Sequence, residues 1–221
     1  MRFGINPTIQ TTGRPTDMAI TAHDIVPDSP TNNFCTLNAL NPNASFLTDG
    51  NLGHSGYTDV KIHATLGFSS SIFYFEVVRG SGSGDAEFGV CRLEAGIPTG
   101  NWGEDNNAAT IWFQTGVVRW QNLTNNIYGA FSDGDILIVA MDVDAGKLWM
   151  GRNGEWFNSG NPAAGTNPII SSMPSGTWTG CIKQYRSGAF NFGQDPSFGG
   201  NKNTPATVDG VTGPFAPSGD A

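Results

Sequence analysis

The sequence has few charged residues and no long stretch that is free of glycine and proline. Only 14% of its 221 residues are charged, whereas about a quarter is usual in soluble domains. The longest stretches without glycine or proline contain 12 residues. Because both residue types weaken helix interiors, helix bundles and coiled coils are all but excluded. The longest apolar run, Ile136–Met141, has six residues, whereas a membrane-spanning helix needs about 20.

Cysteine and basic residues are also scarce. Cys35, Cys91 and Cys181 are odd in number and far apart, which favours small core residues over a disulfide scaffold or a metal site. The 11 basic residues are scattered, and the formal net charge is −8. Because phosphate binding needs clustered Lys and Arg, we expect neither a nucleic-acid partner nor an anionic membrane surface. The N-terminus has no charged-then-apolar pattern, so we expect no signal-dependent secretion and no membrane insertion.

The sequence does contain a regular series of short segments that are rich in aromatic and β-branched residues, as strands are. The Arg152-Asn153-Gly154 segment between two of them indicates a tight hairpin, because both central residues of a type I′ turn need positive φ. Short strands joined by such turns predict an all-β, antiparallel two-sheet β-sandwich. The predicted strands are Ile72–Val78, Glu87–Leu93, Thr110–Gln114, Val117–Trp120, Asp135–Asp142, Lys147–Gly151, Glu155–Phe157, Thr177–Tyr185 and Ala189–Gly193.

The two ends of the chain differ from its middle. Residues 1–30 contain four prolines and one short alternating segment, Met18–Val26, and residues 197–221 hold few large apolar side chains. We therefore divide the chain into an N-terminal arm (1–30), a sandwich (31–196) and an extended C-terminal tail (197–221). Such arms are candidates for anchoring the chain to its neighbours through main-chain hydrogen bonds, and two frayed tails are the alternative.

The segment from Gly134 to Trp156 resembles the core of a SPRY domain. It has the family's Gly-Asp, apolar strand, acidic turn and Trp-bearing hairpin closed by Asn-Gly. Ile72–Val78, Glu87–Val90 and Ala189–Gln194 are similar to the family's Tyr-Phe-Glu-Val, Gly-Val and Asn-Phe-Gly strands. The likeness spans residues 33–196 and implies a concanavalin-like β-sandwich.

Two segments resemble more specifically the SPRY-type domains of tailed-bacteriophage virion proteins. One is the lead-in, residues 28–38 followed by 49–52, and the other is the loop 158–168 after the Trp hairpin. Eukaryotic adaptor versions of the fold lack this loop. The resemblance implies a small, stand-alone component of a phage particle.

Candidate catalytic residues are few. The three histidines lie in no zinc-protease pattern, no serine lies in Gly-x-Ser-x-Gly, and His54 lies in a glycine-flanked predicted turn. Asp142 and Asp144 are two residues apart, whereas a glycosidase needs two carboxylates across a cleft. A calcium loop would need a later bidentate Glu. We therefore expect no enzyme activity, no catalytic residue, no metal and no cofactor.

Tryptophan supplies the candidate binding site. Tryptophans 112, 120, 149 and 156 lie in predicted strands, where large aromatic side chains usually belong to the core. Trp102 lies instead in a polar loop, and an exposed Trp beside Asp and Asn is typical of a sugar or protein contact. The alternative is that Trp102 folds back over the sandwich edge. The candidate ligand or partner loop consists of Trp102, Glu104, Asp105, Asn106 and Asn107.

The resemblance and the missing catalytic patterns predict a non-enzymatic virion structural protein on the particle surface. We expect capsid decoration, anchoring through the arms to major capsid or tail proteins, and a homo-oligomer or lattice-bound state. The alternative is a receptor-binding tail-fibre or tail-tip module that recognises a host surface glycan through the Trp102 loop. A glycan-cleaving enzyme on the same sandwich and an intracellular adaptor are further hypotheses.

Overall fold

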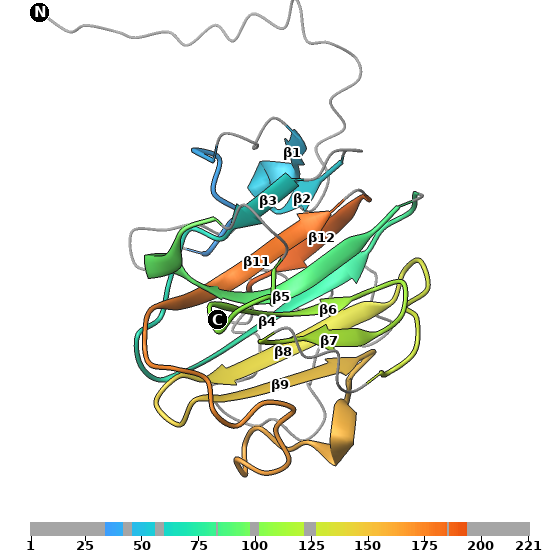
Figure 1. Cartoon of the computed structure of the whole chain (residues 1–221). Helices are drawn as coiled ribbons and strands as arrows, with labels where there is room; N and C mark the ends of the chain where they lie inside the picture. The colour runs from blue at the N-terminus through green and yellow to red at the C-terminus, as the bar shows by residue number, and fades with distance from the viewer. Residues whose placement is uncertain are drawn as a thin grey trace, which may run out of the picture.

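The computed structural model describes residues 34–41, 46–55, 60–82, 84–97, 102–121, 127–184 and 186–193. The predicted N-terminal arm, its Met18–Val26 strand and the C-terminal tail lie outside the described residues. In the described part the chain is all-β, and no helix there is long and apolar enough to cross a membrane. Its strands, which are labelled in Figure 1 except for β10, are β1 (Leu47–Thr48), β2 (Gly53–His54), β3 (Val60–His63), β4 (Ile72–Arg79), β5 (Ala86–Arg92), β6 (Ala108–Trp112), β7 (Val117–Arg119), β8 (Ile136–Asp142), β9 (Lys147–Arg152), β10 (Glu155–Trp156), β11 (Trp178–Gln184) and β12 (Gly188–Asn191).

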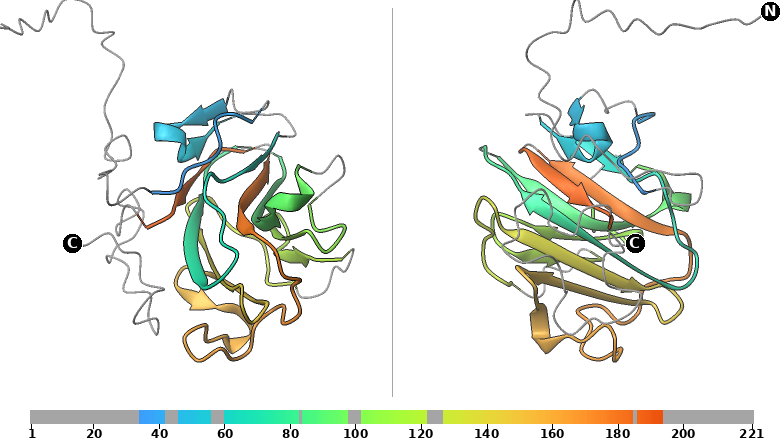
Figure 2. Two further views of the ribbon diagram at one scale, coloured as in Figure 1. Left: turned by 90° about the vertical axis from the view of Figure 1, so that its left-hand side faces the viewer. Right: turned by 180° about the vertical axis from the view of Figure 1, so that it is seen from behind.

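The strands form two antiparallel sheets. One sheet has seven strands in the order β1-β2-β12-β4-β8-β9-β10, and the other has five in the order β3-β11-β5-β6-β7. The left-hand view of Figure 2 shows the two sheets as facing layers. β11 and β12 are consecutive in sequence but lie in different sheets, so the chain crosses between the layers near its C-terminal end. The predicted two-sheet antiparallel sandwich is therefore confirmed.

The central strands follow from the apolar pattern of the sequence. β8, the longest apolar run, pairs with β4 on one side and β9 on the other. All its residues except Asp142 are buried, as expected for a strand covered on both faces. Leu137, Val139 and Met141 point into the main core between the sheets, whereas Ile136, Ile138 and Ala140 belong to apolar clusters on the outer face. The alternation of side chains in a strand thus places two apolar surfaces on one segment.

The predicted Asn-Gly hairpin joins β9 and β10. Asn153 has φ of 54° and Gly154 has φ of 89°, which are the positive values that this turn requires. The Asn153 side chain also accepts a hydrogen bond from the Ile136 amide (2.8 Å) and donates one to Asp135 (2.8 Å). The hairpin is therefore attached to the start of β8 as well as closed on itself.

The sequence pattern missed the three short strands β1, β2 and β3. They contain two to four residues each, too few to show a period. His54, predicted to lie in a turn, is in β2 and buried, with its ring 6.2 Å from that of Phe88. The turn interpretation of His54 is wrong because β2 is held in the sheet by β12, more than 130 residues later in the chain.

The expectation of a core position holds for all three cysteines and for two of the four tryptophans to which it applied. The cysteines are free and buried, and burial raises the pKa of the Cys35 and Cys181 thiols. Trp120 and Trp149 are buried. Trp112 and Trp156 are half-buried.

Candidate binding loop and polar clusters

The candidate loop 102–107 leads into β6 and lies against the outer face of the five-stranded sheet. Trp102 is only 2% exposed and packs against Cys91, Ala108 and Cys181. Its indole Nε1 donates a hydrogen bond to the carbonyl oxygen of Ile182 in β11, at 3.1 Å. The side chain therefore covers the sheet and fills the space above three small residues.

The interpretation of Trp102 as an exposed stacking platform is consequently wrong. The alternative, a tryptophan folded back over the sandwich, is what the structure shows. Glu104, Asp105 and Asn106 remain exposed, and Asn107 is half-buried. The loop thus presents a polar, acidic corner to solvent without an aromatic ring for a sugar to stack on.

The rest of the loop is held by short-range hydrogen bonds. The Asp105 carboxylate accepts the backbone amide and the side-chain amide of Asn107, both at 2.8 Å. Arg92 donates to the Asn107 side-chain oxygen at 3.2 Å, and the Gln121 amide donates to the Asp105 carbonyl at 3.1 Å. Asp105 and Asn107 therefore shape the loop, and Glu104 and Asn106 are exposed.

A buried ionic cluster lies on the same sheet face and was not found from the sequence. Glu87 of β5 accepts a hydrogen bond from Arg119 of β7 at 2.6 Å and lies 3.8 Å from the ammonium of Lys183 of β11. Thr110 of β6 donates to its other oxygen at 3.3 Å. Burial raises the pKa of Glu87, and the charges of Arg119 and Lys183 oppose that rise. The cluster joins four of the five strands across their outer face.

Asp142 and Asp144 have structural partners. Asp142 accepts the Ala145 amide at 2.8 Å, which closes the turn into the Trp hairpin. Asp144 accepts the Ser71 amide at 2.9 Å, which ties that turn to the start of β4. Within the described ranges no three His, Cys, Asp or Glu side chains gather as a metal site would require. Each carboxylate is therefore used to hold a turn.

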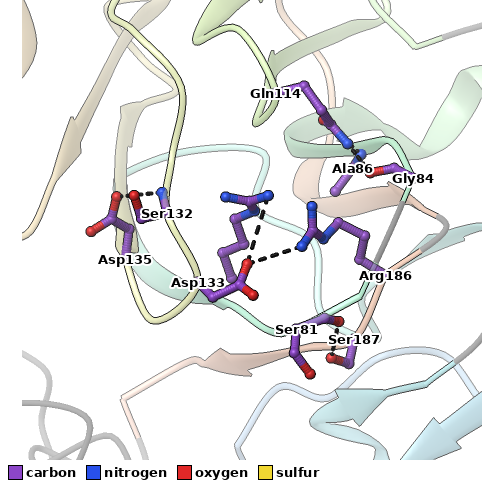
Figure 3. A network of polar contacts seen from close by, with 10 residues as sticks. Ser81, Gly84, Ala86, Gln114, Ser132, Asp133, Asp135, Arg186 and Ser187 are labelled. Atoms are coloured by element: carbon purple, nitrogen blue, oxygen red, sulfur yellow. Dashed lines mark hydrogen bonds and ion pairs between the residues drawn. The ribbon is translucent and has the colours of Figure 1, made fainter.

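A second polar cluster, shown in Figure 3, lies where the turn before β8 meets the start of β12. Asp133 in that turn accepts a hydrogen bond from Arg186 at 2.9 Å and lies 3.7 Å from the guanidinium of Arg79. The three residues are far apart in the sequence, so no local pattern could have revealed the cluster. We call Arg79 and Arg186 the arginine pair.

The arrangement of the two sheets is similar to that of a solved structure. The SPRY domain of human HERC1 superposes with a TM-score of 0.50 at 14% identity, covering 62% of this chain and 85% of that chain. The fold is that of a SPRY domain. At this identity the likeness concerns the SPRY fold alone. No protein-family model matches the sequence, and no curated protein matches it either.

Proposed function

We propose that the chain is a non-enzymatic structural protein displayed on the surface of a tailed-bacteriophage particle, with capsid decoration as its role. The observation that carries this proposal is the resemblance of the lead-in and of loop 158–168 to phage virion SPRY-type domains. Both segments lie outside the strands that every two-sheet sandwich needs. Their likeness therefore adds information beyond the fold.

Loop 158–168 is held to the strands of the sandwich by hydrogen bonds. The indole of Trp149 donates to the carbonyl oxygen of Thr166 at 2.7 Å, and Lys147 donates to that of Gly165 at 2.8 Å. Asn161 and Thr166 exchange two backbone hydrogen bonds at 3.0 Å. The loop thus forms a small closed structure over the outer end of the seven-stranded sheet.

The described part of the lead-in is also built into the fold. The Leu37 amide donates to the Asn51 carbonyl at 2.9 Å, and the Phe190 amide of β12 donates to the Leu52 carbonyl at 2.8 Å. Leu37 and Leu52 are both buried. The lead-in therefore packs beside β12 in the seven-stranded sheet. The segment that resembles phage virion domains thus has a structural role in this fold.

Quantitative mass spectrometry of purified particles tests this proposal. Hundreds of copies per particle support capsid decoration, and a few or a few dozen copies place the chain on the tail instead. A chain that stays in the lysate and does not sediment with washed particles contradicts both placements and favours an intracellular role.

The alternative function, recognition of a host surface glycan, needs a site other than the Trp102 loop. The buried indole removes the stacking surface on which that hypothesis depended. A glycan array that compares the parent chain with the Trp102→Ala variant distinguishes glycan recognition through the Trp102 loop from a purely structural role. Binding that disappears selectively in a folded variant would restore the loop as a contact site.

A further inference from the structure

The outer face of the seven-stranded sheet is buried although no described layer lies over it. Ile136 and Ile138, on this face of β8, are 5% and 2% exposed. The apolar side chains that pack on them are Tyr74, Trp156 and Ala189, which all belong to the same sheet. Figure 2 shows the five-stranded sheet on the opposite side. An outer sheet face that meets water is usually polar and exposed, so this apolar, buried face needs a cover.

One row of residues on this face runs straight across the strands. It lies between the arginine pair, at the end of β4, and loop 158–168, beside Trp149. The strand register gives the row, from one strand to the next, as Asn191, Glu76, Ile138, Gly151 and Trp156. Asn191 and Glu76 are each 1% exposed and are joined by a hydrogen bond of 3.0 Å. Acidic side chains are rarely this buried at a surface, so the row also indicates a cover.

The chain leaves the described structure at the β12 end of this row. Gly193 is the last described residue, and its amide donates to the side-chain oxygen of Asn191 at 3.0 Å. Because the Asn191 side chain lies on the outer face, the backbone beyond β12 turns towards that face, and Gly193 itself is buried. At the other end of the described structure, the Asn38 amide donates to the His63 carbonyl of β3, in the other sheet. The C-terminal segment is therefore the one beside the row.

The residues that follow Gly193 can cross the row. Neighbouring strands lie about 4.8 Å apart, so the middle of the row, between β8 and β9, is about 12 Å from β12. Five extended residues span about 16 Å. Phe198, five residues after Gly193, is the first large apolar side chain of this segment. Two glycines follow it, and they let the backbone lie close to a surface and turn away from it.

We propose that residues 194–200, the covering segment, lie along this row and pack the Phe198 ring on Tyr74 and Trp156. Those two rings are half-buried and 6.2 Å apart in an edge-to-face arrangement, to which a third ring can add in the same way. The covering segment then completes the sandwich, and anchoring to neighbours falls to the N-terminal arm and to the tail after residue 200. The inference goes beyond the virion placement and does not depend on it.

Photo-cross-linking of the full-length chain tests the position of the covering segment. p-Benzoylphenylalanine replaces Phe198 in one variant and Phe215, which lies beyond the covering segment, in the matched control. We expect the probe at position 198 to cross-link to Tyr74, Trp156 or their strand neighbours, as located by mass spectrometry, and the probe at position 215 not to do so. Cross-links from position 198 to the five-stranded sheet, or none to the outer face of the seven-stranded sheet, would overturn the proposal.

Equal mixing of ¹⁵N-labelled and unlabelled chains identifies the chain that supplies the cover. Cross-links within one chain have only the two parent labels, whereas cross-links between chains add species of mixed label. We expect only the first kind. Mixed-label cross-links to the same face would overturn the proposal and assign the face to a neighbouring copy.

Hydrogen exchange of the Trp156 indole gives a second measurement that needs no cross-link. Its Nε1 is buried, and the Trp156→Phe variant identifies its signal. Phe198→Ser should speed this exchange at least about tenfold, because the cover opens more easily, whereas Phe215→Ser should leave it unchanged. An exchange rate that Phe198→Ser does not alter would overturn the proposal, as would equal acceleration in both variants.

Discussion

The outer faces of the two sheets differ in chemistry. That of the seven-stranded sheet is mostly apolar and holds a buried carboxylate, Glu76, which accepts hydrogen bonds from Tyr74 and Asn191. On the seven-stranded sheet, Tyr74, Ile138, Trp149 and Trp156 belong to two apolar clusters. On the five-stranded sheet, the outward-facing side chains include the ion cluster around Glu87. Beside that cluster, Trp102 covers the small residues Cys91, Ala108 and Cys181. Both faces are largely buried, but the first is stabilised by removing apolar surface from water and the second by pairing charges that would otherwise be costly to bury.

The comparison shows how differently the two faces depend on single residues. An apolar face loses stability in proportion to the atoms removed and to the cavity left. Removing one member of a buried ion cluster strongly lowers stability, because a charge is left buried without its partner. Replacing all members with apolar groups of similar volume can leave the stability nearly unchanged. The following substitutions test this contrast, from the largest expected effect to the smallest.

Trp149→Ala should be the most damaging change. Trp149 is 1% exposed and its indole holds loop 158–168 through Thr166. We expect a loss of about 4 kcal/mol in the free energy of unfolding, measured by urea titration. Trp149→Phe keeps most of the apolar volume and loses the hydrogen bond, so its cost should be clearly smaller. An equal cost for both variants would contradict the view that burial dominates on this face.

Glu87→Gln should cost about 3 kcal/mol, because Lys183 and Arg119 lose their buried counter-charge. The triple variant Glu87→Leu, Arg119→Met, Lys183→Met converts the ion cluster into an apolar cluster like that of the other sheet. We expect urea titration to give it a stability closer to the parent than that of Glu87→Gln. A triple variant that is less stable than the single one would show that the two faces do not differ as described.

His54, where the sheets meet, should make stability depend on pH. Burial lowers the pKa of His54 from 6.5 to about 3. Below pH 6.5 the unfolded chain therefore binds a proton at His54, whereas the folded chain does not. As a result, the free energy of unfolding falls as the pH drops from about 6.5 towards 3. The slope contributed by this group approaches about 1.4 kcal/mol per pH unit.

Urea titrations between pH about 7 and about 5 measure this slope above the range in which most carboxylates titrate. His54→Gln should flatten the dependence, whereas His63→Gln, the same change in the other sheet, should keep it. An unchanged slope in His54→Gln would assign the pH dependence to other groups.

Asp105→Ala should have the smallest effect, about 1 kcal/mol, because it removes two hydrogen bonds in an exposed loop. Trp102 should stay buried, since its contacts with Cys91 and Cys181 do not depend on Asp105. The emission maximum of the tryptophans checks this, with Glu104→Ala as a control in the same loop. A red shift towards exposed tryptophan would mean that Asp105 holds Trp102 in place.

The sequence predicted those parts of the fold that depend on local chemistry. The β9–β10 hairpin depends on the positive φ of Asn153 and Gly154, and β4 and β8 on apolar and aromatic runs that can be recognised within eight residues. β1 and β2 could not be predicted, since each has only two residues. β2 is held in the sheet by the distant strand β12, and β1 pairs only with β2.

The candidate site was harder to predict because its determinants are not local. Trp102 resembles an exposed aromatic in its polar loop, and only the Ile182 carbonyl, 80 residues away, shows why it is buried. Arg186 and its partner Asp133 are 53 residues apart. The small residues of β5 and β11 leave space above Cys91 and Cys181 that Trp102 fills, and this space exists only because strands about 90 residues apart pair with each other.

Electron cryomicroscopy of intact particles tests the central claim most directly, namely that this SPRY-fold chain is a surface component of a phage capsid. We predict density of the size and shape of the two-sheet sandwich, repeated at equivalent positions over the outside of the capsid lattice. Density confined to the tail tip, or particles that contain no such density at all, would contradict it.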